Sequence, residues 1–398
     1  MIAFIAIFSS IVVAVSAFTP RNSVLKTTGT ACTNLRMAAE KAPLTGRALI
    51  VQNKGGGHGT VGYNLCKELI AANPSLDVTI LQDACDYSKP PFSSYDELKA
   101  LGANIVETKI AESVPDLSGS FDYIVDNWSK DATNAAVAID IAKASNSKQL
   151  LFVSSAGMYK PADASPHVET DAVKDNGARQ VEVAIMESGV PYTFMRPQYI
   201  YGPKISKRYL DFFMGRANRK LPIPLPLSGE QLVCLTHIED VATLLSAAVG
   251  HPAATNEIFN CGTDRYVSYQ GICTLIHDVL KTPEEDRKYM YYDPKDFSHW
   301  KGSGAQVFPF RRDTFITTPS KAKLALGWSP AHVFSDDVAA EVADYLGTAD
   351  PAKEWATEEL KYDLEVLASK DPGFMFTYPF FDDASINPES RPYPFESA

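Results

Sequence analysis

Residues 47–63 constrain the fold of this chain more than any other stretch. A buried strand is indicated by four successive apolar residues, and an amphipathic helical pattern begins soon after it. Between them, Gly56, Gly59 and Gly62 have the spacing G-x-x-G-x-x-G. This spacing allows a tight turn, a close approach by a ligand and close helix–strand packing. The sequence therefore predicts a helix N-terminus whose backbone N–H groups bind an anion such as a pyrophosphate.

A carboxylate follows the glycine turn at an informative distance. Asp83 ends the next apolar run, residues 78–81, and stands 21 residues after Gly62. A carboxylate near this position binds the ribose of a dinucleotide in folds of this kind. The alternative is a glycine-rich loop that only reverses the chain.

Strand and helix patterns alternate from residue 45 to residue 200. Strand patterns are separated by helical ones, and they cover residues 105–107, 121–125, 149–153 and 192–195. This order predicts right-handed crossovers and an α/β fold with a doubly wound parallel sheet, which binds ligands at the carboxyl ends of its strands. The pattern loosens after residue 200. We therefore expect a nucleotide-binding domain over residues 45–200 and a smaller, mixed cap domain over residues 201–370, interleaved with the first.

The two ends of the chain differ from its middle. An apolar run with small residues at its end predicts a signal peptide over residues 1–17. A Ser/Thr-rich segment with three bases and no acid up to residue 39 predicts a transit peptide over residues 18–40. This tandem resembles the bipartite presequences of plastids with extra membranes and predicts the chloroplast stroma; secretion is the alternative. Residues 371–398 are expected to form a tail rich in Pro and aromatic residues.

Charge and cysteine content narrow the functional classes. The formal net charge of −11 excludes a general polyelectrolyte attraction to nucleic acid, so any RNA contact needs a local basic patch. The six cysteines form no C-x-x-C pair. This pattern argues against a disulfide scaffold and against a zinc site built from cysteines, and it fits a reducing compartment.

Further motifs follow the glycine turn in order. They are SSAGMY (154–159), RPQYIYGP (196–203), HIEDVA (237–242), FNCGTD (259–264) and LGWSP (326–330). Together with the turn they resemble the extended short-chain dehydrogenase/reductase superfamily of the sugar-nucleotide epimerase/dehydratase type. The resemblance implies a Rossmann sheet and an NAD(P) site at Gly56, Gly59, Gly62 and Asp83. It also implies a Tyr-x-x-x-Lys pair that handles the proton during hydride transfer.

That pair is missing from its expected helix. Asn176 and Gln180 stand at its place, so the catalytic residues are unknown. Two other matches to the spacing, Tyr95/Lys99 and Tyr291/Lys295, lie outside the expected helix and are interpreted as coincidence. We therefore expect the dehydrogenase chemistry to be lost and the NAD(P) site to be either retained or vestigial.

A narrower resemblance accounts for this loss. Asn53-Lys54 before the turn, the insert at 88–98, DAVKD (171–175) and VFPFR (307–311) are similar to the chloroplast stem-loop-binding proteins. The resemblance implies a plastid RNA-binding protein that supports RNA processing, stability or translation, and an endoribonuclease for which Mg²⁺ is the expected cofactor. Its partners would be plastid RNA and ribosomes or a transcription complex, with no membrane contact after processing. An oligomer remains open.

Two basic segments with interleaved aromatic residues are the candidates for RNA contact. The first is the basic segment, residues 204–220, in which Tyr209, Phe212 and Phe213 are interleaved. Its alternatives are contact with a nucleotide-sugar diphosphate and a solvated helix whose Phe residues lie in the core. The second segment adjoins Phe308 and Phe310. The basic residues are Lys204, Lys207, Arg208, Arg216, Arg219, Lys220, Arg311 and Arg312.

Metal-dependent RNA hydrolysis needs carboxylates that converge on a hard cation. The candidates at strand ends are Asp83, Asp86 and Asp126, with Asp83 preferred as the ribose anchor. His58 is interpreted as a surface loop residue, and the pair His237 and Asp240 as structural.

Ser155 and Tyr159 are expected to line the cleft, in packing or nucleotide contact. The favoured prediction is a plastid RNA-binding protein that either binds or cleaves stem-loop RNA. The alternatives are an NAD(P)-dependent nucleotide-sugar epimerase or reductase with a non-standard catalytic set, and a structural member of a ribonucleoprotein.

Overall fold

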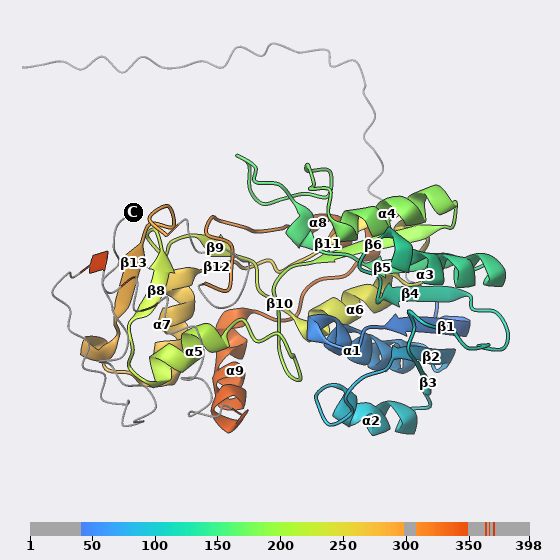
Figure 1. Ribbon diagram of the computed structural model, residues 1–398, viewed down its shortest axis with the longest axis horizontal. Helices are drawn as coiled ribbons and strands as arrows, with labels where there is room; N and C mark the ends of the chain where they lie inside the picture. Colours follow the sequence, from blue (N-terminus) through green and yellow to red (C-terminus); the bar gives the residue numbers. More distant parts are fainter. Residues whose placement is uncertain (1–40, 298–307, 349–362, 364–365, 367–368, 371–398) are drawn as a thin grey trace, which may run out of the picture. The chain divides into compact units, whose positions relative to one another are not determined.

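The computed structural model describes residues 41–297, 308–348, 363, 366 and 369–370 (Figure 1). The predicted presequence and the predicted tail therefore lie outside the described residues. Within the described part, none of the helices combines the length and the apolar character that a membrane span requires.

A seven-stranded sheet is built from residues 45–261, and each neighbouring pair of strands is parallel. The strand order is β11-β6-β5-β4-β1-β2-β3. The strands are β1 (Thr45–Gln52), β2 (Ser75–Asp83), β3 (Asn104–Thr108), β4 (Tyr123–Asn127), β5 (Gln149–Val153), β6 (Tyr192–Pro197) and β11 (Glu257–Cys261). This confirms the doubly wound α/β fold. The order reverses between β1 and β4, which is where such folds bind ligands.

Alternating residues of each strand pack into two separate cores. Leu49 and Val51 of β1 belong to the cluster that also contains residues of α3 (Ala132–Ser145) and α4 (Gly177–Ser188). Ala48 and Ile50 belong to the cluster that contains residues of α1 (Gly56–Ala72) and α6 (Ile238–Ala248). The period of two follows from the pleat, because successive side chains point to opposite faces.

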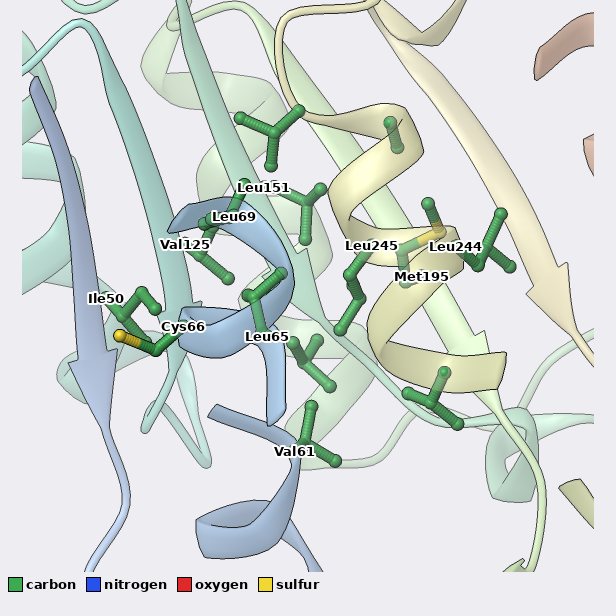
Figure 2. Packing of buried hydrophobic residues seen from close by; sticks show 14 of the residues in the cluster. Ile50, Val61, Leu65, Cys66, Leu69, Val125, Leu151, Met195, Leu244 and Leu245 are labelled. Atoms are coloured by element: carbon green, nitrogen blue, oxygen red, sulfur yellow. The ribbon is translucent and has the colours of Figure 1, made fainter. Parts of the chain in front are cut away.

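The contact between α1 and α6 fixes the helix that follows the glycine turn. Figure 2 shows Leu65 and Leu69 of α1 near Leu244 and Leu245 of α6, and all four side chains are buried. Burial of each leucine contributes about 2 kcal/mol to folding. At the start of α1, a Cβ on Gly62 would lie 2.0 Å from Oε1 of Gln52 in β1. Glycine at this position therefore permits close helix–strand packing, as predicted.

The chain after β6 builds a second cluster and also returns to the sheet. The second cluster contains residues of α5 (Asp211–Asn218), α7 (Tyr269–Val279) and α9 (Phe334–Thr348). Meanwhile α6 packs on α1, and β11 pairs with β6. Segments after residue 200 thus contribute both to the sheet and to the second cluster, and the division of the chain into two interleaved domains stays a prediction. The other elements are α2 (Tyr95–Ala100), β7 (Ile200–Tyr201), β9 (Leu232–Val233), β10 (Thr236–His237), β12 (Val267–Ser268), α8 (Ser320–Leu326) and short 3-10 turns.

The proline-rich segment 221–226 is extended and pairs with a distant part of the chain. It contains β8 (Ile223–Pro226), which pairs in parallel with β13 (Tyr289–Tyr292). The N–H groups of Ile223 and Leu227 donate to the carbonyls of Lys288 and Tyr292. The prolines fall on the intervening positions, where a missing N–H donor leaves these ladder bonds intact.

Candidate functional site

A cleft of about 550 Å³ lies at the carboxyl ends of the strands, as the fold predicts. Its walls come from the segments that follow β1, β4, β5 and β6. They contain Asn53, Lys54, Gly55, Val61, Lys130, Val153, Ser154, Ser155, Pro197, Tyr199, Ile200, Lys207 and Tyr209. We call this space the lysine cleft.

The walls of the lysine cleft carry charge of one sign. Lys54 lies in the glycine turn, Lys130 follows β4, and Lys207 lies beyond β7. None of the described residues that line the cleft has a carboxylate. In a chain with a net charge of −11, such a wall focuses positive potential on one concave surface and favours an anionic ligand.

The glycine turn presents a helix N-terminus to this cleft. The helix α1 begins at Gly56, has no acidic residue in its first turn and receives no side-chain cap. Oδ1 of Asn53 accepts a hydrogen bond from the N–H of Gly55 and holds the turn. A Cβ on Gly59 would lie 2.9 Å from the ring of Phe92. The side chain of His58 lies outside the described part of the structure.

Asp83 lies at the end of β2, where the sequence predicts it, but its carboxylate is already bonded. Its Oδ1 accepts from the N–H of Ile110 at 3.2 Å, and its Oδ2 accepts from Nε1 of Trp128 at 3.2 Å. Lys54 Nζ lies 3.7 Å from Oδ2, and Asp83 is only 7% exposed. The carboxylate of Asp83 is therefore already bonded to protein donors, and the roles of the glycine turn and of Asp83 in binding a dinucleotide stay predictions.

The expected place of the Tyr-x-x-x-Lys pair holds a helix cap. Oδ1 of Asn176 accepts from the N–H of Arg179 at 3.0 Å and begins α4. Gln180 is exposed and donates to Oδ1 of Asp175 at 3.4 Å. Both side chains are neutral amides, which cannot take up or release a proton near neutral pH.

Glu182, on the inward face of α4, forms a buried ion pair with Arg196 of β6. Nε and Nη2 of Arg196 donate to the two carboxylate oxygens of Glu182 at 2.9 and 2.8 Å. Oγ of Ser154 donates to the same carboxylate at 2.8 Å. The sequence reasoning missed Glu182, although an acid between apolar residues on an inward helix face indicates a buried partner.

Tyr159 hydrogen-bonds to Arg196 of this ion pair. It is not among the residues that line the cleft, contrary to expectation. It accepts from Nη1 of Arg196 at 3.0 Å and donates to Oδ1 of Asn260 at 2.7 Å. Burial raises the pKa of Tyr159 to about 12. Ser155 does line the cleft, and its Oγ accepts from the N–H of Gly157 at 3.1 Å.

Two other tyrosines, Tyr199 and Tyr209, line the cleft, and Tyr209 contacts a lysine. Lys207 Nζ lies 4.8 Å from the ring centroid of Tyr209, and the rings of Tyr209 and Tyr199 are 5.3 Å apart in an edge-on arrangement. Burial raises the pKa of Tyr199 to about 12, while its hydroxyl accepts from the N–H of Arg311. The group is local in sequence, since Tyr199, Lys207 and Tyr209 fall within eleven residues, and the basic segment already contains two of its members.

The basic segment is mostly paired with acids from distant parts of the chain. Its salt-bridge partners are Glu97 for Lys204, Asp211 and Asp344 for Arg208, Asp363 for Arg216, and Asp286 for Lys220. Arg219 donates to the carbonyl of Gly215 and to the hydroxyl of Tyr345. Lys207 alone among the six is a lining residue of the lysine cleft in the described structure.

The aromatic residues of the basic segment are divided by the fold. Phe212 and Phe213 are buried in the second cluster, as the alternative interpretation of the segment expects, and cannot stack on a base. The helix α5 also covers only residues 211–218. Tyr209 remains at the cleft wall.

The second basic segment, Arg311 and Arg312, hydrogen-bonds to backbone carbonyls. Nη2 of Arg311 donates to the carbonyls of Gly157 and Tyr159 at 2.6 and 3.2 Å, and its guanidinium lies 3.6 Å from the ring centroid of Phe315. Nη1 of Arg312 donates to the carbonyl of Pro294 at 3.3 Å. Their role in RNA contact stays a prediction.

The three aspartates proposed for a metal do not converge in the described residues. Asp126 is fully buried and accepts from the N–H groups of Trp128 and Ser129, and burial raises its pKa. Oδ1 of Asp86 accepts from Ser88 at the surface.

A different group, His237, Glu239 and His332, does bring together three potential ligand atoms. Nδ1 of His237 accepts from the N–H of Glu239, and Asp240 accepts from the N–H groups of Ala331 and His332. The HxxD pair is thus structural, as expected. Burial, with the charge of His332 next, lowers the pKa of His237 to about 4. Burial opposes protonation of His332, but its acidic neighbours outweigh this and raise its pKa.

Comparison with known proteins decides the family. A model described as the NAD dependent epimerase/dehydratase family matches residues 55–262. The chain belongs to this family. It is 36% identical over 187 residues to the chloroplast stem-loop binding protein of 41 kDa b of Arabidopsis thaliana, over 46% of this chain and 48% of that protein. It is 21% identical over 217 residues to the UDP-glucose 4-epimerase of Vibrio cholerae, over 51% of this chain and 66% of that protein.

The chain thus spans between about half and two thirds of the length of these curated relatives. Solved structures of other family members have the same fold. UDP-glucuronic acid 4-epimerase from Bacillus cereus, in complex with NAD, aligns with a TM-score of 0.57 and 16% identity over 75% of this chain and 98% of that chain. The dTDP-glucose 4,6-dehydratase DesIV from Streptomyces venezuelae aligns with a TM-score of 0.59 and 14% identity over 76% and 98%. Both resemblances predicted from the motifs are confirmed.

Proposed function

We propose that this member of the epimerase/dehydratase family is a plastid RNA-binding protein that holds RNA phosphates in the lysine cleft. One observation carries the proposal: three lysines face a cleft that none of the described lining residues supplies with a carboxylate. Polyanion binding depends on such local charge, because each neutralised phosphate releases counterions. Loss of the proton-handling pair from α4 supports binding over the oxidoreductase chemistry of the family.

The relative from Arabidopsis supports the compartment and the kind of RNA. Its name includes both "chloroplast" and "stem-loop binding", and it shares 36% identity with this chain over 187 residues. The presequence pattern is consistent with import into the plastid. In the stroma the protein would act in RNA processing, including that of rRNA, in RNA stability or in translation, with ribosomes or transcription complexes as partners.

The aromatic residues in the wall of the cleft favour unpaired loop nucleotides over a duplex. Tyr199 and Tyr209 stand in its wall beside the lysines, and an aromatic ring can stack on any unpaired base. Protein recognition of RNA commonly takes place at loops, where unstacked bases can be splayed out. The protein would therefore bind the loop of a stem-loop and leave the stem outside the cleft.

The proposal is for binding rather than hydrolysis. Asp83, Asp86 and Asp126 do not converge in the described structure, so no carboxylate group there is arranged to hold Mg²⁺ against a phosphate. A diphosphate at the glycine turn would use the same lysines as RNA. NAD(P), whether retained or vestigial, would then compete with RNA.

Photo-cross-linking tests the surface directly. A stem-loop RNA with 4-thiouridine in its loop should cross-link to peptides that contain Tyr199 or Tyr209, and excess NAD⁺ should reduce the yield. Cross-links confined to other surfaces would refute the cleft as the RNA site. The same RNA, followed by its length after incubation with Mg²⁺, should stay intact; specific shortening would instead establish an endoribonuclease.

The second candidate function is a nucleotide-sugar epimerase or reductase with a substituted proton donor. The contact of Lys207 with the ring of Tyr209 at the cleft favours it, because a lysine beside a tyrosine is the family's usual pairing. Sustained change in nicotinamide absorbance with UDP- or dTDP-sugars, abolished by Tyr209→Phe, would support this function. Absence of turnover across such sugars would leave RNA binding as the cleft's role.

A further inference from the structure

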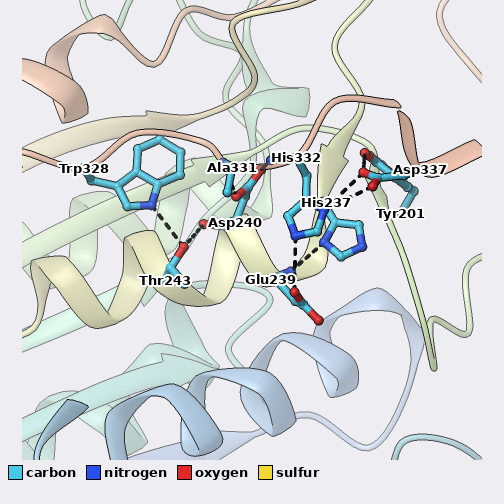
Figure 3. A network of polar contacts seen from close by, with 9 residues as sticks. All are labelled: Tyr201, His237, Glu239, Asp240, Thr243, Trp328, Ala331, His332 and Asp337. Atoms are coloured by element: carbon cyan, nitrogen blue, oxygen red, sulfur yellow. Dashed lines mark hydrogen bonds and ion pairs between the residues drawn. The ribbon is translucent and has the colours of Figure 1, made fainter. Parts of the chain in front are cut away.

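The strongest unassigned feature is the group formed by His237, Glu239 and His332 (Figure 3). His237 caps α6, and Glu239 lies in the first turn of that helix. His332 belongs to the segment between α8 and α9. One ligand atom from each residue lies within 4.8 Å of the other two.

The partners of His332 fix the direction of its ring. Nδ1 of His332 lies 3.2 Å from Oδ2 of Asp337, and that oxygen also accepts from the hydroxyl of Tyr201 at 2.6 Å. A carboxylate at Nδ1 places the ring proton on that nitrogen. Nε2 then points its lone pair at Oε2 of Glu239, which is 3.2 Å away.

Two acceptors at this distance need either a proton or a metal ion between them. A second proton on His332 would form a hydrogen bond between its Nε2 and the Glu239 carboxylate, and it would not engage His237. The ring of His237 stacks on that of His332, with centroids 3.7 Å apart and planes inclined by 19°, and brings a third ligand atom, a second ring nitrogen, into the group. A metal ion can accept all three donor atoms, whereas one proton cannot.

We propose that His237, Glu239 and His332 bind a transition-metal ion of the zinc class. Two imidazole nitrogens and one carboxylate oxygen suit this class, and a water molecule would complete a tetrahedral set. Ligand atoms on such an ion are roughly 3.3 Å apart, since each bond is about 2.0–2.1 Å long. Loading therefore draws the three residues together and opens the stacked rings. The side chain of Glu239 is 54% exposed and can turn toward the two histidines.

Asp337 is the positioning residue of this site. Metal-bound histidines commonly donate their second ring N–H to a carboxylate, which orients the ring. Asp240 supports the same loop by accepting from the N–H groups of Ala331 and His332 at 2.8 and 3.1 Å. The ion would join the start of α6, which packs on α1, to the segment that leads into α9. Its role would be to brace the two parts of the fold, independently of the RNA site.

Calorimetric titration of the chelator-treated full chain with Zn²⁺ tests the proposal. We expect one ion per chain, a melting temperature that rises with Zn²⁺ concentration, and at least tenfold weaker binding in Glu239→Gln and in His332→Gln. Asp337→Asn, which keeps all three ligands, should weaken binding by about 10- to 100-fold. Glu112→Gln, at an exposed glutamate elsewhere, is the matched control and should bind as the parent does.

Titration with Co²⁺ excludes the cysteines as the source of binding. Visible absorption of tetrahedral Co²⁺ without a thiolate charge-transfer band is the expected spectrum. A thiolate band, affinity unchanged in Glu239→Gln and His332→Gln, or no stoichiometric uptake of Zn²⁺ by the parent would each overturn the proposal. Glu239 is half exposed, so its variant is expected to fold even if that of His332 does not.

Discussion

The lysine cleft and the basic segment are both rich in positive charge, but the fold uses that charge in opposite ways. In the basic segment, partners such as Glu97, Asp286 and Asp363 come from parts of the chain far away in sequence and form ion pairs there. In the cleft, three lysines from separate loops face one space that none of the described lining residues supplies with a carboxylate, and Lys54 alone of the three is described in an ion pair, at 3.7 Å from Asp83 behind the wall. Positive charge that is dense along the sequence is thus neutralised, whereas charge that is scattered along it is concentrated by the fold.

The largest expected effect concerns the buried end of the basic segment. Arg216 binds the carboxylate of Asp363 with two hydrogen bonds of 2.8 and 2.9 Å, and both residues are buried. Arg216→Met should lower the free energy of unfolding by about 3–5 kcal/mol, because it leaves a buried charge without its partner. Chemical denaturation measures this. Arg216→Met with Asp363→Leu should recover most of the loss, and RNA affinity per folded molecule should stay unchanged in both; a loss of affinity would restore the segment as an RNA surface.

The second prediction removes the charge of the cleft. The triple variant with Gln at Lys54, Lys130 and Lys207 should bind stem-loop RNA roughly 10- to 100-fold more weakly at 0.1–0.2 M salt. The slope of log affinity against log salt should fall by about 2, as expected for three lost contacts to single-stranded phosphates. Filter-binding titrations at several salt concentrations provide both numbers. An unchanged slope would show that RNA binds elsewhere.

A third prediction follows from the surplus of acids around the basic segment. Burial is the main cause that raises the pKa of Glu341 to about 7, although Arg208 opposes it. The folded protein therefore holds this proton more tightly than the unfolded chain, so stability is lost as pH rises from about 4.5 through 7. Glu341→Gln should remove this loss and stabilise the protein at pH 8 by on the order of 1–2 kcal/mol. The difference from the parent should vanish below pH 4.5, and a constant difference across pH would contradict the assignment.

The smallest expected effect is at the exposed end of the same segment. Lys220 forms a surface ion pair with Asp286 at 2.8 Å. Exposed pairs of this kind contribute little to stability. Lys220→Gln should therefore leave both the melting temperature and the RNA affinity unchanged, and it serves as the matched control for the cleft lysines. Weaker RNA binding by this variant would contradict the proposal that RNA contacts the lysine cleft and not the basic segment.

The fold was predictable because its signal is local and periodic. The glycine turn, the strand at Gln149–Val153 and the helix after Asp131 are each specified by neighbours in the sequence, and the structure confirms them. Prolines disfavour strand pairing, but β8 pairs through alternate N–H groups and so tolerates the prolines between them. That exception depends on β13, which lies more than 60 residues away.

The site was predictable only in part. The position of the cleft followed from strand order, and the absence of a Tyr-x-x-x-Lys pair from α4 followed from motif spacing. The engagement of Asp83 by Ile110 and Trp128, however, depends on contacts between loops. The convergence of His332 with His237 depends in the same way on a chain crossing that no local pattern encodes.

At Asn176, the residue that stabilises the start of α4 occupies the position expected for the catalytic tyrosine of the family. An asparagine that accepts from the first turn of a helix contributes about 1 kcal/mol, which an aromatic side chain there would forfeit. Attempts to engineer hydride-transfer activity back into this scaffold by placing tyrosine at residue 176 would thus begin from a weakened α4. Compensating stabilisation elsewhere would have to come first.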